Sequence, residues 1–202
     1  SLPRMEGHRR GAGVIEPLID AALDLRIPVI SLFAFSTENW TRPAAEVRGL
    51  WELLEYFFSA KIDLIRSRGV RVHVSGARTR LQASTRRIIE SVTAETAKFK
   101  NITLNFCINY GGRQEIVDGI NRWLVERKDG EKLTEKRMAG LLYTPSLPDV
   151  DLMIRTSGEY RISNFMLWQL AYAELVFMKV LWPDFKPRHL YEAVYEYQQR
   201  DR

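Results

Sequence analysis

Short apolar runs alternate along the chain with segments of helical periodicity, and this alternation limits the folds that the sequence can adopt. The runs expected to form strands are 28–35, 70–76, 101–109, 150–154 and 174–178. Helical patterns lie near 13–25, 43–68, 80–98, 113–127 and 134–142, with later ones near 164–171 and 187–200. Strands that alternate with helices build βαβ units, in which helices cover parallel strands. The sequence therefore predicts an α/β fold with a mostly parallel central sheet flanked by helices.

Length and composition predict one soluble domain. A chain of 202 residues suits a single core, and fractions of 46% hydrophobic and 27% charged residues are typical of soluble globular proteins. No segment reaches the roughly 18 uninterrupted apolar residues of a membrane span. A single cysteine, Cys107, leaves no disulfide framework and no metal–thiolate site, so a cytoplasmic location is expected. The first residues lack both a starting Met and a signal-peptide core, which we interpret as a cut end.

The positive charge points to anionic ligands without identifying them. The net charge is +5, and arginine greatly outnumbers lysine among the 30 basic residues. Arginine binds phosphate through two parallel hydrogen bonds, so its excess indicates phosphate ligands, although a genome of high G+C content explains it equally well. The basic residues are scattered, which argues against a nucleic-acid groove. No G-x-G-x-x-G, Walker A or zinc-ligand spacing is present, which argues against the common nucleotide enzymes.

Polar loops follow three of the predicted strands, at the strand ends where open parallel sheets bind ligands. These loops are FSTENWTRP (35–43), NYGGRQE (109–115) and RTSGEYRIS (155–163). In the first, the hydroxyls of Ser36 and Thr37 stand at a helix entrance and Arg42 adds charge, a combination that suits a phosphate oxygen. The alternative is an ordinary helix cap with Trp40 packed beside it.

The loop 155–163 contains a still more selective set of side chains. Arg155 and Arg161 converge on one group if the Ser-Gly turn between them folds back. Ser163 would then cap a helix that begins at Asn164, with its N–H groups pointing outward. Two guanidinium groups, a hydroxyl and a helix N-terminus together suit a diphosphate. The alternative is a structural salt bridge to Glu159.

Two further features remain open from the residues alone. The segment 43–68 has apolar residues on more than one face, which fits either a helix buried between the sheet and a dimer partner or a helix that lines a hydrocarbon tunnel. Glu174 places a carboxylate at the start of an apolar strand. Such a group needs a partner, and Mg²⁺, an arginine and backbone amides are the candidates.

Four ordered segments resemble a known family. PRMEGHRRG (3–11), LFAFSTENWTRP (32–43), LNFCINYGGRQEI (104–116) and the run 150–185 resemble the cis-prenyltransferases, in particular the bacterial undecaprenyl diphosphate synthases. The resemblance implies that family's fold rather than a nucleotide-binding Rossmann domain. It also implies a Mg²⁺-dependent homodimeric enzyme that adds isopentenyl diphosphate units in cis geometry to an allylic diphosphate such as farnesyl diphosphate. The expected product is a long polyprenyl diphosphate, such as undecaprenyl diphosphate for the cell-wall lipid carrier.

The resemblance also assigns roles to individual residues. Asn39 would be the proton acceptor and Glu174 a Mg²⁺ ligand. Isopentenyl diphosphate would be held by Arg155, Arg161, Ile162 and Ser163, the allylic diphosphate by Arg4, His8 and Arg42, and the junction would be lined by Ser36, Thr37, Glu38 and Trp40. A hydrocarbon product implies release at a membrane surface, so a location at the inner face of the membrane is compatible with a cytoplasmic protein.

One departure from the family limits this reading. The family's first strand and its Asp-Gly-Asn-Gly loop, which carries the metal-binding Asp, are not in residues 1–202, and we expect their omission to leave an exposed sheet edge. The competing hypotheses are a non-catalytic scaffold subunit of a prenyltransferase complex and a binding module for other anionic ligands. Retention of the phosphate-binding arginines favours the enzyme over the scaffold, and the tunnel-like helix favours it over the module.

Overall fold

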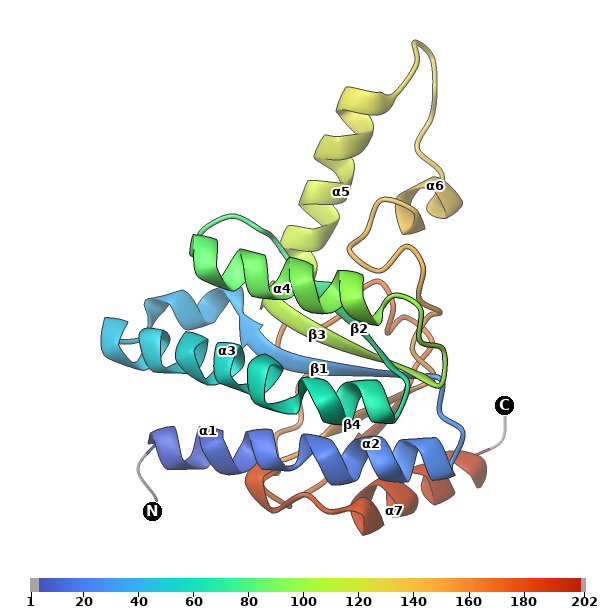
Figure 1. The fold of residues 1–202 in the computed structure, drawn as a ribbon. Helices are drawn as coiled ribbons and strands as arrows, with labels where there is room; N and C mark the ends of the chain where they lie inside the picture. The colour runs from blue at the N-terminus through green and yellow to red at the C-terminus, as the bar shows by residue number, and fades with distance from the viewer. Residues whose placement is uncertain (1–3, 201–202) are drawn as a thin grey trace.

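The computed structural model describes residues 4–200, and side chains from residue 6 onward (Figure 1). The strands are β1 (Val29–Ser36), β2 (Val70–Ser75), β3 (Ile102–Tyr110), β4 (Leu152–Arg155) and β5 (Glu174–Phe177). The α-helices are α1 (Arg4–Gly13), α2 (Ile15–Asp24), α3 (Ala44–Ser67), α4 (Ala83–Thr96), α5 (Gly112–Glu126), α6 (Glu135–Ala139) and α7 (Pro187–Gln198), and the 3₁₀ turns are η1 (Thr37–Thr41) and η2 (Trp182–Asp184). All five predicted strands are confirmed, as is the α/β class with parallel strands and flanking helices.

The strands form two hydrogen-bonded sheets. In the first the order is β1-β3-β2, and in the second β4 pairs with β5; every pairing is parallel. The central strand β3 is buried along almost its whole length, as an apolar parallel strand should be. Strand β1, at one edge of the first sheet, is mostly half-buried. The outer edge of β1 and the free edge of β4 both remain available for hydrogen bonding.

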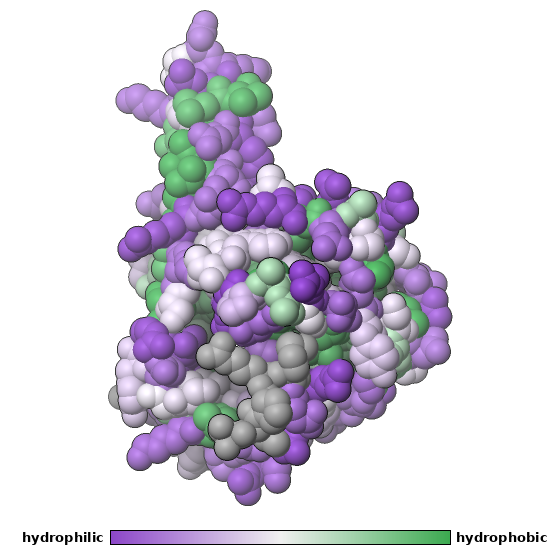
Figure 2. Space-filling model, turned by 90° about the vertical axis from the view of Figure 1, so that its left-hand side faces the viewer, coloured by the Kyte–Doolittle hydropathy of each residue, from purple (hydrophilic) through white to green (hydrophobic). Residues whose placement is uncertain are grey.

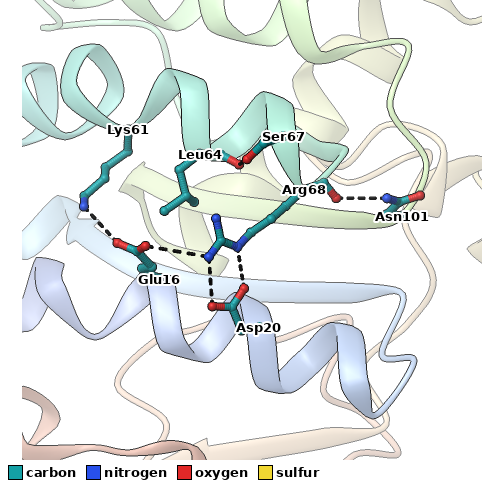
Figure 3. A network of polar contacts seen from close by, with 7 residues as sticks. All are labelled: Glu16, Asp20, Lys61, Leu64, Ser67, Arg68 and Asn101. Atoms are coloured by element: carbon teal, nitrogen blue, oxygen red, sulfur yellow. Dashed lines mark hydrogen bonds and ion pairs between the residues drawn. The ribbon is translucent and has the colours of Figure 1, made fainter.

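Helices α1 and α2 run end to end beside α3, and ion pairs join α2 to α3 (Figure 3). Lys61 Nζ lies 2.9 Å from Glu16 Oε2, and the Arg68 guanidinium binds both oxygens of Asp20. The hydrogen bond from Arg68 lowers the pKa of Asp20. Partly exposed pairs of this kind contribute about 1 kcal/mol or less each.

The helix predicted near 164–171 is wrong. The chain there forms a series of turns, and the backbone is left-handed at Ser163 (φ 50), Asn164 (φ 63) and Met166 (φ 43). Left-handed residues cannot continue an α-helix. The apolar run FMLWQLAYA is instead buried by tertiary contacts, with Met166 and Leu170 in a small second core beside Tyr110 and Met153. The predicted Ser163 cap with outward N–H groups therefore does not exist.

Helix α5 projects away from the rest of the molecule (Figure 1). Its buried residues, Gly112, Glu115 and Gly119, lie in its first half. Figure 2 shows hydrophobic side chains on the surface of the projecting segment. Of the helices in the described part of the chain, none combines the length and apolar character that a membrane crossing requires.

Candidate active site

A cavity of about 1220 Å³ lies between β1 and β4. Every residue from Val29 to Phe35 on one side, and from Leu152 to Arg155 on the other, contributes to its wall. Helices α1 and α3 and the turn η2 complete the enclosure. The unpaired edges of the two sheets thus face a single space, and the loops that follow β1 and β4 both open onto it.

One part of the cavity wall is polar and charged. It contains His8 from α1, Asn39 from η1, Arg42 and Glu46 from the start of α3, and Arg155 from the end of β4. Glu46 accepts a hydrogen bond from Arg42 Nη1 at 2.8 Å, and its carboxylate lies 4.0 Å from His8 Nε2. Glu46 therefore orients side chains from both α1 and α3 beside the cavity.

Arg155 differs from the other basic residues of this wall. It is half-buried at the carboxyl end of β4, and within residues 6–200 no carboxylate lies within ion-pairing distance of its guanidinium. A half-buried arginine without a partner is costly unless an anion completes its hydrogen bonds. Thr156 and Ser157, which follow it on the cavity wall, add hydroxyl groups. This end of the cavity is therefore suited to an anionic ligand.

The turn η1 has a defined internal structure that sets the position of Asn39. The Asn39 side-chain oxygen accepts a hydrogen bond from the Ser36 backbone N–H at 3.0 Å, which closes the turn as a capping box. Trp40 packs against Phe35 and Trp51 and donates from Nε1 to Asn109 Oδ1 at 2.7 Å. Trp40 is thus a packing residue here, while Asn39 remains on the cavity wall.

The remainder of the wall is largely apolar. Helix α3 contributes Leu50, Leu54 and Phe57, and β3 contributes Phe106 and Ile108. Phe58 and Ile65, on the same broad face of α3, are buried in the core. The apolar residues of α3 thus contribute both to the core and to the cavity wall, and a hydrocarbon tunnel along this helix stays a prediction.

The structure brings together only part of the predicted site. Cavity-lining residues among those predicted are His8, Asn39, Arg42, Arg155 and Ile162. The side chain of Arg4 lies outside the described residues. Residues that do not line the cavity are Ser36, Thr37, Glu38, Trp40, Arg161, Ser163 and Glu174.

Arg161 and Arg155 do not converge in this structure. Arg161 is exposed and pairs with Glu159, which is the structural alternative that the sequence left open. Ser157, between them, has a left-handed backbone (φ 71), and Ser157 N and Gly158 N donate to the carbonyls of Val180 and Met178. These two bonds hold the start of the loop 155–163 against the segment after β5. Arg161 lies farther along the same loop, on an exposed outer turn.

Glu174 begins β5, whereas Arg155, on the cavity wall, ends the neighbouring parallel strand β4. Glu174 pairs in register with Leu152, whereas Arg155 pairs with Phe177, so about 10 Å of strand separates the two levels. The Glu174 carboxylate binds Arg200. Among the side chains that the structure describes, no group of three His, Cys, Asp or Glu residues could hold a metal ion. These residues by themselves do not form a magnesium site.

A buried hydrogen-bond network behind the loop 155–164 was not predicted. Glu115, fully buried in α5, accepts hydrogen bonds from Tyr110 Oη, Tyr143 N and Gln169 Nε2. Burial, together with the nearby Glu115 carboxylate, raises the pKa of the Tyr110 hydroxyl, which therefore remains a donor. Burial likewise raises the pKa of Cys107, so its thiol is unreactive. The network joins β3, α5 and the turns after Asn164.

Two asparagines also escaped prediction. Asn109 (φ 49) donates to the carbonyls of Ala77 and Thr79 while accepting from Trp40, and Asn164 bonds to η1 and to the start of α5. Asparagine directly after an apolar strand or before a turn is a known signal for left-handed backbone. That signal was present in NYGG and SNF, but it does not reveal the distant partners.

Comparisons with known proteins agree with this geometry. The family model described as "Putative undecaprenyl diphosphate synthase" matches residues 1–202. An isoprenyl transferase of Leptospira interrogans is 46% identical over 204 residues, covering 98% of this chain and 85% of the relative. An isoprenyl transferase of Bacillus subtilis is 45% identical over 206 residues, covering 100% of this chain and 79% of the relative.

Solved structures show the same likeness. A probable undecaprenyl diphosphate synthase from Campylobacter jejuni superposes with a TM-score of 0.87 at 33% identity, covering 96% of this chain and 90% of that chain. Lavandulyl diphosphate synthase from Lavandula x intermedia, in complex with dimethylallyl diphosphate, gives a TM-score of 0.94 at 28% identity, covering 100% and 89%.

Proposed function

The chain belongs to the undecaprenyl diphosphate synthase family of prenyltransferases, and from this premise we propose that it condenses isopentenyl diphosphate with an allylic diphosphate in cis geometry. The proposed primer is farnesyl diphosphate, and the proposed product is a long polyprenyl diphosphate that serves as a cell-wall lipid carrier. An allylic diphosphate is also the ligand in the complex of the lavandulyl neighbour, which supports this substrate class.

One observation carries the proposal: a single cavity joins Arg155, which has no carboxylate partner among the described side chains, and the polar turn η1 to an apolar interior lined by α3. Departure of a diphosphate from an allylic carbon leaves negative charge that a fixed guanidinium stabilises. The carbon must meanwhile be kept from water. The growing chain is hydrocarbon, and each CH₂ moved out of water contributes about 0.8 kcal/mol, so an apolar channel suits it.

The predicted residue roles remain proposals. We propose that Asn39 accepts the proton lost from isopentenyl diphosphate, since it lines the cavity in a fixed orientation. His8 and Arg42, with Arg4, would bind the allylic diphosphate, and Arg155, with Ile162, the isopentenyl diphosphate. Arg161 and Ser163 would join the latter site only if the outer turn moves inward, since they lie outside the cavity wall. Ser36, Thr37, Glu38 and Trp40 would act through the position of η1.

We also propose that the reaction needs Mg²⁺. Magnesium is usually bound by one or two carboxylates together with substrate phosphate oxygens and water, so it would enter with the diphosphates. When bound, it would neutralise charge on the departing diphosphate. Glu174 remains a predicted ligand, although its carboxylate binds Arg200 in this structure. The family's Asp-bearing strand would find unpaired backbone at β1 or β4.

A radiolabel assay tests the proposed function. Full-length protein incubated with farnesyl diphosphate, labelled isopentenyl diphosphate and Mg²⁺ should yield butanol-extractable labelled product, and a chelator should abolish it. Thin-layer separation of the dephosphorylated product would give its length. Absence of elongated product from the protein alone, with turnover restored by a second prenyltransferase subunit, would favour the scaffold alternative instead. An apolar product also leads us to propose a cytoplasmic location with release at the inner membrane surface.

The proposed homodimer has a candidate surface on α5. Val117, Ile120 and Leu124 recur at helical spacing and are 50%, 38% and 48% exposed, and Val125 is 87% exposed. Such an apolar stripe on a projecting helix is unusual for a free surface. A second copy, which brings an identical stripe, would cover it through a two-fold contact.

We expect the double substitution Ile120→Glu and Leu124→Glu to convert a dimer to a monomer, since it would place charges in an apolar contact. Light scattering coupled to size exclusion measures the mass directly. Ala60→Glu, on an exposed position of α3 outside the stripe, is the control and should leave the mass unchanged. A wild-type mass near the 23.5 kDa of one chain would contradict the homodimer.

A further inference from the structure

Asn164 bonds at once to two segments that lie far from it in the sequence, the turn η1 and the start of α5. Its side-chain amide Nδ2 donates to Glu38 Oε1 at 2.9 Å, in η1. Its side-chain Oδ1 accepts from the Arg113 backbone N–H at 2.9 Å, and its backbone carbonyl accepts from Gly112 N at 2.7 Å. We name these three bonds the Asn164 latch.

The latch supplies a helix cap that the sequence of α5 lacks. The residue before α5 is Gly111, which has no side chain to accept a hydrogen bond from the first turn. Asn164 provides that acceptor from a segment 51 residues away. A left-handed backbone at Asn164 (φ 63) is needed to present both the side chain and the carbonyl, and asparagine tolerates this conformation better than most residues.

Close packing leaves the latch little freedom. A methyl group at Gly111 would lie 2.6 Å from Thr37 Oγ1 and 2.9 Å from Asn164 Nδ2. Partial burial raises the pKa of Glu38. Hydrogen bonds to its carboxylate, first of all the one from Asn164, outweigh this effect and lower the pKa, so Glu38 is a carboxylate. The turn η1, the start of α5 and Asn164 are therefore held together, while the outer turn that carries Arg161 takes no part in the latch.

We propose that Asn164 is a positioning residue that sets the distance between the two substrate-binding loops. One loop carries Arg155 and Ile162, and the other carries Asn39. This inference rests on the proposed function. Asn164 does not line the cavity. Condensation needs the carbon of one substrate to approach the allylic carbon of the other, so a small change in loop spacing reduces turnover more than it reduces binding of either substrate.

An exchange of donor and acceptor tests the latch. Asn164→Asp keeps the left-handed backbone and the acceptor for Arg113 N, but it places a second carboxylate against Glu38. We expect kcat to fall by about tenfold or more, with little change in the KM of either substrate, since a hydrogen bond to a charged group is lost. In Asn164→Asp with Glu38→Gln, the Gln amide donates to the Asp carboxylate, and kcat should return to within about threefold of wild type.

The pH profile gives an independent readout. In the Asn164→Asp protein the facing carboxylates can share a proton, so part of the lost activity should return as pH falls, which is not expected of the double variant. Urea unfolding of each protein shows whether stability changes in parallel. Absence of rescue in the double variant, or losses of activity and stability of equal size, would contradict the positioning role of Asn164 but not the proposed function. A wild-type protein that makes no prenyl product would overturn the proposed function and this inference together.

Discussion

Replacing Arg155 by alanine should reduce kcat/KM by about 10²–10³-fold, since removal of one fixed donor from a site of developing negative charge has effects of that size. The physical reason is that Arg155 reaches the cavity with no carboxylate partner among the described side chains, so its charge is available to a diphosphate. For the same reason the free energy of unfolding should change by less than about 1 kcal/mol. Steady-state kinetics and urea unfolding of the same preparations measure both quantities.

Controls separate charge from geometry. Arg155→Lys keeps the charge but loses the planar fork, and we expect an intermediate kcat/KM. Arg137→Ala removes an arginine that is paired with Glu126 away from the cavity, so its kcat/KM should equal that of wild type. Equal free-energy losses in catalysis and folding for Arg155→Ala would assign this residue to structure and would remove the main support for the proposed site.

Replacing Glu115 by alanine should lower the free energy of unfolding by about 3–5 kcal/mol, which is the largest stability effect expected for this chain. The alanine would leave the buried Tyr110 hydroxyl and the half-buried Tyr143 N–H without their acceptor, and the buried Gln169 amide would keep only Thr144 Oγ1. It would also open a cavity at a position that is 0% exposed. Urea titration followed by tryptophan fluorescence gives the midpoint and the slope.

Glu115→Gln is the matched variant for this network. Glutamine keeps the shape and one carbonyl acceptor, and the Tyr110 hydroxyl can turn to accept from the new amide. Its loss should therefore be about 1 kcal/mol or less. If the alanine and glutamine variants unfold at the same urea concentration, the hydrogen bonds of Glu115 do not stabilise the fold as described.

The strands and most helices could be predicted because their signals are local. An apolar run such as 101–109 forms a strand wherever it is buried, and α3 is confirmed within a residue of its predicted limits. The prediction of a helix near 164–171 was wrong because the spacing of its apolar residues fits a helix as well as it fits the buried turns that form there. The competing interactions were tertiary: the Asn164 carbonyl bonds to Gly112 N, and Gln169 bonds to Glu115.

The candidate site was predictable in type but only partly in arrangement. The sequence by itself determined the fold class, the family and the presence of arginine and hydroxyl side chains after β1 and β4, since these depend on periodicity and on motifs read in order. Only the tertiary structure decided that Arg155 lies on the cavity wall, without a carboxylate partner in the described part of the chain, while Arg161 pairs with Glu159. The reason is that backbone turns and long-range hydrogen bonds, such as those of Asn164 and Glu115, set where a loop side chain points, and no short stretch of sequence contains both partners.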